Sequence, residues 1–348
     1  PRPILAVTGT DGKTTTTDMV VAMLRAAGHR AEAVGNTDVP FVDAVDTDLD
    51  VFVIECSSFR LAWIEHFRAD AAAWLNFAPD HLNWHATLEG YEATKARIFD
   101  LQRSSDVAVG FLDDPVVSNH LRRAPGRQIS FGLDRGDYRR EGDELVGPSG
   151  PIGDVASMGR ALPHDITNAL AAAALVLETG LGEASAIASA LARFEAQPHR
   201  LESIAEADGI TWYNDSKATT PHAAATAIRA FDSLVLIAGG SRKGVDLSPM
   251  ATGVDHVRAV VAIGEAAPDV RAVFEPTTTV VEASSMAAAV AAAAEIARPG
   301  DAVVLSPGCA SFDWYGGYPE RGDHFRSLVR HHLSMSSGDP ATHVEASA

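Results

Sequence analysis

The stretch that decides the fold is "AVTGTDGKTTTTDMV", which runs from Ala6 to Val20. An apolar strand over residues 4–7 leads into a turn bracketed by Gly9 and Gly12, and a helix follows. The two glycines allow backbone N–H groups to approach an anion, the helix begins at its positive end, and Lys13 adds a full charge. The sequence therefore predicts a phosphate-binding loop, in which Thr14 could place its hydroxyl on a magnesium ion.

One position in this loop departs from the common phosphate-loop pattern G-x-x-x-x-G-K-[ST], which requires glycine where this chain has Val7. The plain alternative is an ordinary strand-to-helix turn with a surface lysine. Strand, glycine turn, Lys13 and helix nevertheless follow one another in the expected order, which favours the phosphate loop.

Apolar runs of strand length alternate with helical stretches along the whole chain, which predicts an α/β fold with mostly parallel sheets. The expected strands in the first half are 4–7, 51–54 and 71–75, and the expected helices are 18–27, 87–101, 165–177 (capped by Asp165) and 184–194. Residues 122–159, rich in Gly, Pro, Asp and Arg, are expected to form hairpins or loops.

A break near residues 197–200 separates this half from a second alternation, with expected strands at 210–213, 234–237, 259–263, 279–282 and 302–305. Each of these strands is apolar on both faces, as in a buried parallel sheet. We therefore expect an ATP-binding domain over residues 1–198, an α/β domain over 199–334 and a disordered tail over 335–348.

The composition limits the possible functions. The 348 residues carry a formal charge of −18, which argues against a nucleic-acid binder, because phosphate backbones require a basic face. No stretch has the ~18 uninterrupted apolar residues that a membrane span needs. Two distant cysteines, Cys56 and Cys309, predict neither a disulfide framework nor a zinc ribbon, which favours the cytoplasm.

A phosphate loop with magnesium needs carboxylates nearby, and "VFVIECSSF" supplies Glu55 at the end of an apolar strand. Ligands gather at the carboxyl ends of strands in an open parallel sheet. Since an isolated carboxylate at a sheet edge is common, the prediction that Glu55 binds metal depends on the loop.

The stretch "NFAPDHLNWH" places further polar residues at the same edge of the sheet, including Asn76, Asp80, His81 and His85. His81 and His85 have the i, i+4 spacing of a zinc-protease helix, but Leu82 stands where that motif requires glutamate. A zinc hydrolase and a structural loop are the alternatives to substrate or magnesium contacts.

The remaining candidates are weak when taken singly. Lys95, in "YEATKARIF", would ordinarily be a solvated lysine paired with Glu92. Three loops of the second half follow predicted strands and combine lysines, serines and glycines: "WYNDSKATTPHAA", "IAGGSRKGVD" and "LSPGCASFDWYGGYPERGDHF". They could hold a small anion.

Together, these motifs resemble the Mur ligase family, the ATP-dependent amide-forming enzymes of cell-wall precursor synthesis. "TGTDGKTTT" looks like the shortened phosphate loop of that family, and "ECSSFRL", "NFAPDHLNWH", "YEATKARIF", "NDSKATTPHAA" and the two later loops are similar to the members that add D-glutamate. The resemblance extends from Ile4 to about Leu333. It implies a central P-loop-type ATPase domain and a C-terminal Rossmann-like domain, and it implies that the family's N-terminal UDP-binding domain is absent.

The resemblance also implies roles for particular residues. Lys13, Glu55, His81 and Lys95 would be catalytic, and Thr14, Glu55, His81 and a carbamylated Lys95 would support two Mg²⁺ ions. ATP would be bound by Gly9, Thr10, Gly12, Lys13, Thr14, Thr15, Asp165, Asn168, Arg200 and Asp215. Asn36, Ser57 and His81 would contact UDP-muramoyl-L-alanine, and Lys217, Thr219, Lys243, Ser311, Phe312 and Tyr318 would contact D-glutamate.

The expected protein is thus a monomeric ligase of small molecules that binds neither nucleic acid nor membrane. Asp11, Arg60 and Asp165 depart from the residues usual in the family, Asp11 by adding a negative charge beside the phosphates. The alternatives are another Mur-type or folylpolyglutamate-like ligase, or a homologue that binds ATP without catalysis.

Overall fold

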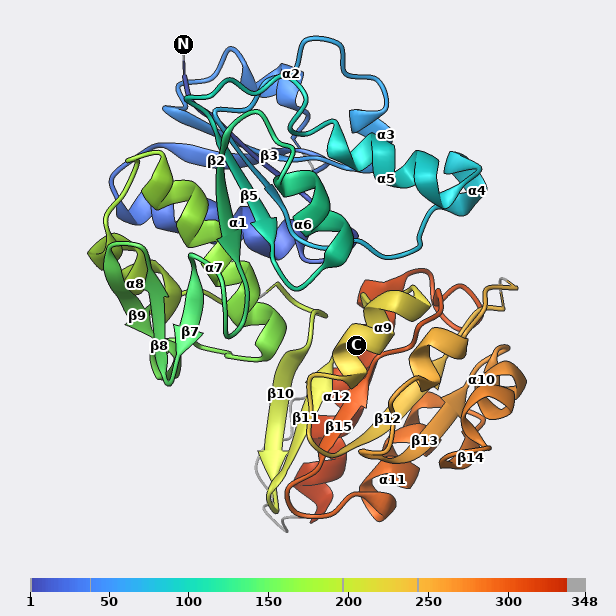
Figure 1. Cartoon of the computed structure of the whole chain (residues 1–348). Coiled ribbons are helices and arrows are strands. Elements are labelled where there is room, and N and C mark those ends of the chain that lie inside the picture. Colours follow the sequence, from blue (N-terminus) through green and yellow to red (C-terminus); the bar gives the residue numbers. More distant parts are fainter. Residues whose placement is uncertain (1, 38, 196, 243, 337–348) are drawn as a thin grey trace, which may run out of the picture. The chain divides into compact units, whose positions relative to one another are not determined.

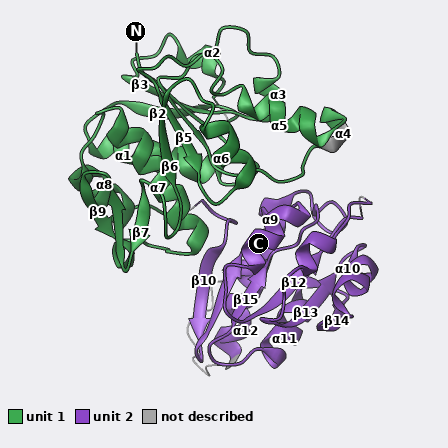
Figure 2. Ribbon diagram, in the orientation of Figure 1, with its two compact units in different colours: residues 1–195 green, residues 196–348 purple. Residues whose placement is uncertain are grey.

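A computed structural model describes residues 2–37, 39–195, 197–242 and 244–336, except for the side chains of Leu82, Asn83 and Ser336. The chain divides into two compact units, unit 1 over Pro1–Glu195 and unit 2 over Ala196–Ala348 (Figure 2). The expected disordered tail lies, from residue 337 onward, outside the described residues.

Unit 1 is built on a six-stranded sheet in which every neighbouring pair is parallel (Figure 1). In spatial order its strands are β2 (Ala31–Gly35), β3 (Val51–Glu55), β1 (Ile4–Thr8), β4 (Ala71–Trp74), β5 (Val107–Phe111) and β6 (Arg127–Phe131). The central strand β1 lies between β3 and β4, where the strand order reverses. Ligands of open α/β sheets bind outside the strand ends at such a reversal.

Helices cover both faces of this sheet because residues alternate between the faces along each strand. Leu5 and Val7 of β1 pack with α1 (Lys13–Ala26), α7 (Pro163–Glu178) and α8 (Ala184–Ala192). Ala6 faces the opposite core, which includes side chains of α2 (Phe41–Ala44), α3 (Ser58–Leu61) and α6 (Pro115–Leu121). Two further helices, α4 (Leu82–His85) and α5 (Leu88–Ala96), follow β4.

A small antiparallel sheet lies within the segment that was expected to form hairpins or loops. It consists of β7 (Arg139–Glu141), β8 (Glu144–Gly147) and β9 (Gly150–Asp154), followed by the short helix η1 (Val155–Ser157). Tyr138 connects it to α7 by donating a hydrogen bond from its hydroxyl to Glu178 at 2.7 Å. The hairpin prediction is confirmed, but β6, from the same segment, joins the main sheet.

Unit 2 contains a second six-stranded sheet, which confirms the predicted mostly parallel α/β fold. In spatial order its strands are β10 (Glu202–Ala207), β11 (Ile210–Asn214), β15 (Ala302–Leu305), β12 (Leu234–Gly239), β13 (Val257–Ile263) and β14 (Thr279–Ala283). The five expected strands are present. The antiparallel edge strand β10 was not predicted, and β14 is not buried on both faces as expected, because it forms the other edge.

The helices of unit 2 are α9 (Pro221–Ile228), η2 (Ser248–Ala251), α10 (Ala267–Phe274), α11 (Met286–Ile296) and α12 (Tyr318–Ser336). Residues of α11 and α12, among them Val290 and Phe325, pack with Trp212 and Ile237 on one face of the sheet.

Several helix ends differ from their prediction. α1 begins at Lys13 rather than Asp18, and α5 ends at Ala96 rather than residue 101. The expected cap Asp165 is wrong, because α7 begins at Pro163 after the N-cap Leu162. Asp165 lies in the first turn of the helix, where its carboxylate accepts a hydrogen bond from the Leu162 N–H at 3.2 Å.

Candidate active site

The loop between β1 and α1 has the geometry of an anion cradle. Gly12 lies in the left-handed region at φ 79°, and a Cβ there would meet Asn168 Oδ1 at 2.7 Å, so that only glycine fits. Lys13 folds back over the loop and donates hydrogen bonds to the carbonyl oxygens of Gly9 at 2.9 Å and Thr10 at 2.7 Å. The loop glycine, the lysine and Asn168 therefore lie together, as the expected ATP contacts require.

Asn76 braces this loop from the end of β4. Its Oδ1 accepts hydrogen bonds from the backbone N–H groups of Thr10 and Asp11, both at 2.9 Å, and its Nδ2 donates to Asp11 O at 3.1 Å. The sequence predicted that Asn76 lies at this edge of the sheet but did not predict its bracing role.

A second brace comes from Tyr91 on α5, which the sequence did not mark as a site residue. Thr10 Oγ1 donates to the carbonyl of Ala78 at 3.1 Å and lies 3.3 Å from the Tyr91 hydroxyl. Burial raises the pKa of Tyr91, so the phenol stays protonated and can donate.

Lys95 is not the solvated lysine that its local sequence suggests. The side chain is 1% exposed and its Nζ donates a hydrogen bond to Gly9 O at 2.6 Å. Burial lowers the pKa of Lys95 well below 10.5, and the charge of Lys13 lowers it further. Glu92, the expected partner, instead contacts His120 at 2.8 Å.

Glu55 ends β3 with its carboxylate almost completely buried, at 2% exposure. Its Oε1 accepts a hydrogen bond from Asn36 Nδ2 at 2.9 Å, whereas Oε2 is buried and has no hydrogen-bond partner among the described residues. A buried carboxylate oxygen without a partner is costly unless a ligand satisfies it. Glu55 therefore fits a bound cation. The nearby Ser57 is buried and caps α3 by accepting a hydrogen bond from Arg60 N–H at 3.4 Å.

His81 lies in the left-handed region at φ 53°, with its ring centroid 4.7 Å from that of Phe59. Burial lowers the pKa of His81, and the positive charges of Lys13 and Lys95 lower it further. The carboxylate of Asp80, whose Oδ2 lies 3.4 Å from His81 Nε2, opposes this effect. These influences favour a neutral imidazole, which is the form that binds metals.

The zinc alternative finds no ligand set in this region. His85 Nε2 lies 2.9 Å from Ser58 Oγ. Across the described ranges, no group of three or more His, Cys, Asp or Glu side chains is arranged to hold a metal ion.

The other expected ATP contacts of unit 1 lie in the first turns of two helices. Thr14 and Thr15 directly follow Lys13 on α1. Asp165 is held by Arg160 through two hydrogen bonds of 2.6 Å, and Asn168 lies against Gly12 of the loop.

In unit 2 the expected residues lie at the carboxyl ends of β11 and β15. Asp215 joins these ends: its Oδ2 accepts from Ser306 Oγ at 2.7 Å and its Oδ1 from Leu201 N–H at 3.1 Å. Lys217 follows, with its Nζ 5.4 Å from the ring centroid of Tyr318. These contacts bring Asp215, Lys217 and Tyr318 to one end of the sheet.

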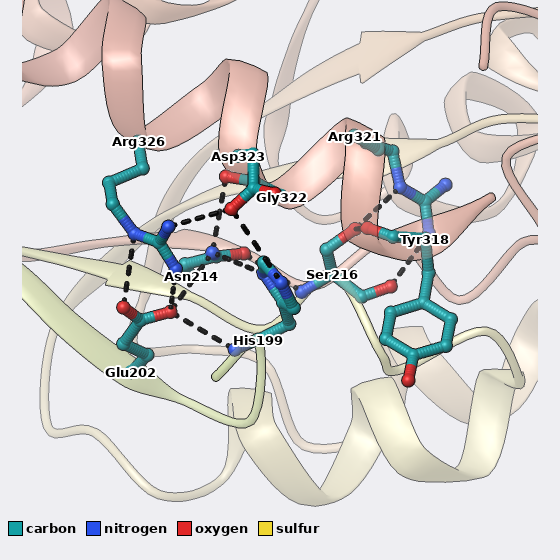
Figure 3. A network of polar contacts seen from close by, with 9 residues as sticks. All are labelled: His199, Glu202, Asn214, Ser216, Tyr318, Arg321, Gly322, Asp323 and Arg326. Carbon is teal, nitrogen blue, oxygen red and sulfur yellow. Dashed lines mark hydrogen bonds and ion pairs between the residues drawn. The ribbon is translucent and has the colours of Figure 1, made fainter. Parts of the chain in front are cut away.

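Arg321 was missed by sequence reasoning although it organises these loops. It is buried on α12 and donates hydrogen bonds to Ser216 Oγ at 2.9 Å, to Ser216 O at 2.8 Å, and to the carbonyls of Cys309 and Ala310 (Figure 3 shows its contact with Ser216). Burial lowers the pKa of Arg321 to about 10, which leaves it charged at neutral pH. The arginine of "PERGDHF" was visible in the sequence, but nothing local marked it as buried.

The remaining expected residues differ in exposure. Ser311 is buried beside the Arg321 contacts, whereas Phe312 is 66% exposed and Thr219 is half-buried. Arg200 lies between His199 and Leu201, two residues with left-handed backbones. Lys243 lies outside the described residues.

Comparison with known proteins agrees with this geometry. The Mur ligase middle domain matches residues 7–176, and the glutamate ligase domain of the Mur ligases matches residues 199–309. The fold and site thus define an amide-forming ligase of the Mur type, and the chain belongs to the Mur ligase family.

The relatives in sequence carry one particular name. A UDP-N-acetylmuramoylalanine–D-glutamate ligase from Frankia casuarinae is 43% identical over 342 residues, covering 94% of this chain and 72% of the relative. A protein of the same name from Mycobacterium tuberculosis is 39% identical, covering 95% of this chain and 75% of the relative.

Solved structures show the same fold at lower identity. The MurF ligase from Thermotoga maritima, in complex with ADP, has a TM-score of 0.71 at 17% identity and covers 96% of this chain and 81% of that one. E. coli FolC in complex with ADP has a TM-score of 0.65 at 19% identity and covers 97% and 90%.

Proposed function

We propose that this chain is an ATP-dependent ligase that joins D-glutamate to UDP-N-acetylmuramoyl-L-alanine in peptidoglycan precursor synthesis. The relatives that cover 94–95% of the chain carry the name of that ligase. The observation that carries the proposal is the convergence of Lys13 and the buried Lys95 on the carbonyl of Gly9, inside a glycine loop at the reversal point of a parallel sheet.

The chemistry requires two transfers. The carboxylate of the alanyl substrate attacks the γ-phosphorus of ATP, which releases ADP and leaves an acyl phosphate. The amine of D-glutamate then attacks the acyl carbon, phosphate leaves, and the nitrogen loses a proton to give the amide. Lys13 and the positive N-terminal end of α1 would stabilise the negative charge on the transferred phosphoryl group.

We assign two magnesium ions to this site by its donor set. Thr14, Glu55, His81 and a carbamylated Lys95 would hold them, and the unpartnered Oε2 of Glu55 fits that role. The ions would neutralise charge that develops on the phosphoryl oxygens. Oxygen-rich ligands of this kind suit magnesium better than zinc.

The environment of Lys95 supports its carbamylation. Only an unprotonated amine attacks CO₂, with loss of a proton, and the lowered pKa of Lys95 favours that form. The product is an anion, which would relieve the repulsion between the ammonium groups of Lys95 and Lys13.

We assign the remaining substrate contacts by the resemblance to the Mur ligases. Asn36, Ser57 and His81 would contact the UDP-muramoyl substrate, and Asp165, Asn168, Arg200 and Asp215 would contact the nucleotide. D-glutamate would be held by Lys217, Thr219, Lys243, Ser311, Phe312 and Tyr318. A lysine and hydroxyl donors suit an amino acid with two carboxylates.

All the substrates of the proposed reaction are small molecules. We propose that the protein is a monomer and that it acts in the cytoplasm. Both cysteines are buried thiols, as a reducing compartment allows. Among the described residues, no helix combines the length and apolar character needed to cross a bilayer.

A phosphate-release assay tests this proposal. The purified protein is incubated with ATP, Mg²⁺, UDP-N-acetylmuramoyl-L-alanine and D-glutamate, and the product is identified by mass. We expect phosphate release that requires both substrates and is lost in Lys13→Ala. Release with another amino acid or with a folate would instead indicate another ligase of this fold, and ATP binding without turnover would indicate a non-catalytic homologue.

A further inference from the structure

Asn214 is completely buried at the end of β11, immediately before the loop that carries Asp215 and Lys217. Its Nδ2 lies 2.9 Å from His199 Nδ1, 3.2 Å from Glu202 Oε2 and 3.2 Å from the carbonyl oxygen of Gly322 (Figure 3). Its Oδ1 accepts a hydrogen bond from the Ser216 N–H at 3.2 Å. One amide side chain thus connects β10, the loop after β11, α12 and the segment before β10.

These contacts fix both the amide and the imidazole. The Glu202 carboxylate and the Gly322 carbonyl can only accept, and the Ser216 N–H can only donate, so the amide has one satisfactory orientation. His199 Nδ1 therefore faces an NH₂ group, which cannot accept a hydrogen bond. The NH₂ group has two hydrogens for three neighbouring acceptors, and its 2.9 Å contact, the shortest of the three, assigns one of them to His199 Nδ1. This arrangement favours a neutral ring with its proton on Nε2, on the side where Asp323 lies 3.8 Å away.

His199 in turn holds the residues proposed to bind substrates. Its carbonyl accepts a hydrogen bond from the Lys217 N–H at 3.0 Å, and its own N–H donates to Glu202 Oε2 at 3.0 Å. Both His199 (φ 64°) and Leu201 (φ 44°) have left-handed backbones, and Arg200 lies between them. Such backbones cost free energy and persist only where surrounding contacts impose them.

Gly322 on α12 provides the space for this arrangement. A Cβ at this position would come within 2.2 Å of His199 Nδ1 and 3.0 Å of Asn214 Nδ2. Any side chain at position 322 must therefore displace the imidazole or the amide.

We infer that Asn214 is a positioning residue: it holds His199 in the neutral form that accepts at Nδ1, and so fixes the backbone of Arg200 and Lys217 for substrate binding. The role of Arg200 and Lys217 rests on the function proposed above. The junction of Asn214, His199 and Gly322 is a property of the fold, and it can be tested separately.

Charged groups surround His199 on several elements. Glu202 faces it from β10, Asp323 and Arg326 from α12, and Lys217 from the loop after β11. Burial lowers the pKa of His199; Asp323 and Glu202 oppose this effect, and Arg326 and Lys217 add to it. Protonation would direct an N–H from Nδ1 at the Asn214 NH₂ group, so the junction should loosen as the pH falls through this pKa.

The direct test is nitrogen NMR of His199 in the wild-type protein, assigned with His199→Gln. We expect a neutral ring protonated at Nε2 at pH 7.5. Asn214→Asp removes the NH₂ donor and adds a carboxyl group beside both His199 Nδ1 and Glu202 Oε2. The added negative charge favours a protonated ring, so this variant should raise the His199 pKa. A ring protonated at Nδ1 in the wild type, or an unchanged pKa in Asn214→Asp, would overturn the inference.

Kinetics provide the second readout. Asn214→Asp and Gly322→Ala should each raise KM for D-glutamate or ATP about tenfold, as expected for one lost hydrogen bond, with a smaller change in kcat. Alanine ordinarily favours a helix over glycine, so weaker binding in a folded Gly322→Ala points to the clash. Ser327→Ala, exposed on the same helix, is the control.

The two readouts separate the two proposals. Absence of turnover in the wild type would refute the proposed function and leave the NMR test of the junction intact. If Gly322→Ala folds and binds both substrates with wild-type KM, the positioning role is refuted even where the ligase activity is present.

Discussion

Lys95 and Lys13 share one acceptor: their ammonium groups donate hydrogen bonds to the carbonyl oxygen of Gly9 at 2.6 and 2.9 Å. Two positive charges so close together disfavour each other, and Lys95 is also buried. Both effects lower the pKa of Lys95, burial more than the charge of Lys13. The neutral amine of Lys95 is therefore favoured, and this is the form that reacts with CO₂ to give a carbamate.

This relationship predicts a dependence of activity on CO₂. Lys95→Ala should lose activity on the order of 100-fold, as for other lost charge-stabilising groups, and bicarbonate should not restore it. The wild-type protein, depleted of CO₂ at neutral pH, should lose activity and recover it when bicarbonate is added. Incorporation of ¹³C-bicarbonate, detected by NMR as a carbamate carbon, is the direct measurement. Full activity in Lys95→Ala would make Lys95 a structural residue only.

The position of Asp11 in the loop leads to a prediction that its negative charge weakens nucleotide binding. Its backbone lies in the phosphate loop, and its charge acts on the nearby Lys95. If its carboxylate faces the phosphates, Asp11→Asn should tighten ADP and ATP binding several-fold, with a larger effect at low salt. Calorimetric titration measures this affinity. Equal affinities in both proteins would mean that the carboxylate points away from the nucleotide.

Much of the site could be predicted from the sequence because its determinants are local. The glycine spacing before Lys13 and the position of Glu55 at the end of an apolar run depend on neighbours in the chain, and the structure has both where they were expected. The start of α1 was missed because threonines are weak helix formers, and the run of four after Lys13 obscured it.

Other features depend on residues far apart in the chain. The burial of Lys95 results from its contact with Gly9, 86 positions away, and Arg321 contacts Ser216, 105 positions away. No periodicity within a helix reports such contacts. The strand β10 was missed for a similar reason, because its pairing with β11 at an edge permits a half-polar sequence.

The lowered pKa of Asp301 predicts that unit 2 loses stability at acidic pH. Asp301 is buried at the start of β15; burial raises its pKa, but hydrogen bonds from Arg258 and Ser233 outweigh this effect and lower the pKa from 3.8 to about 2. A carboxyl group with a lowered pKa stabilises the folded state above pH 4, and this stabilisation is lost as the pH falls towards 2.

We therefore expect Asp301→Asn to cost about 2 kcal/mol at pH 7 and less at pH 3. Urea unfolding followed by circular dichroism at both pH values measures the difference. Asp255→Asn, an exposed aspartate of the same unit, serves as the control. A cost that does not change with pH would show that the lost hydrogen bonds, and not the charge, stabilise this site.

The contacts of Arg321 predict that its substitution weakens the binding of D-glutamate in particular. Its guanidinium binds four acceptors in two loops at once: Ser216 Oγ, Ser216 O, Cys309 O and Ala310 O. Lysine keeps the charge but has one nitrogen, so Arg321→Lys leaves some of these acceptors unpaired. The loops of Lys217 and Ser311 should then separate, and KM for D-glutamate should rise about tenfold, as for one lost hydrogen bond.

The same variant should change KM for the UDP-muramoyl substrate less, because its proposed contacts, Asn36, Ser57 and His81, belong to unit 1. Arg330→Lys, an exposed arginine on the same helix, should leave both values unchanged. Initial rates with each substrate varied in turn measure the two constants. Equal increases in both KM values would mean that Arg321 stabilises the protein generally, because a clamp on the loops proposed to hold D-glutamate should affect that substrate more than the other.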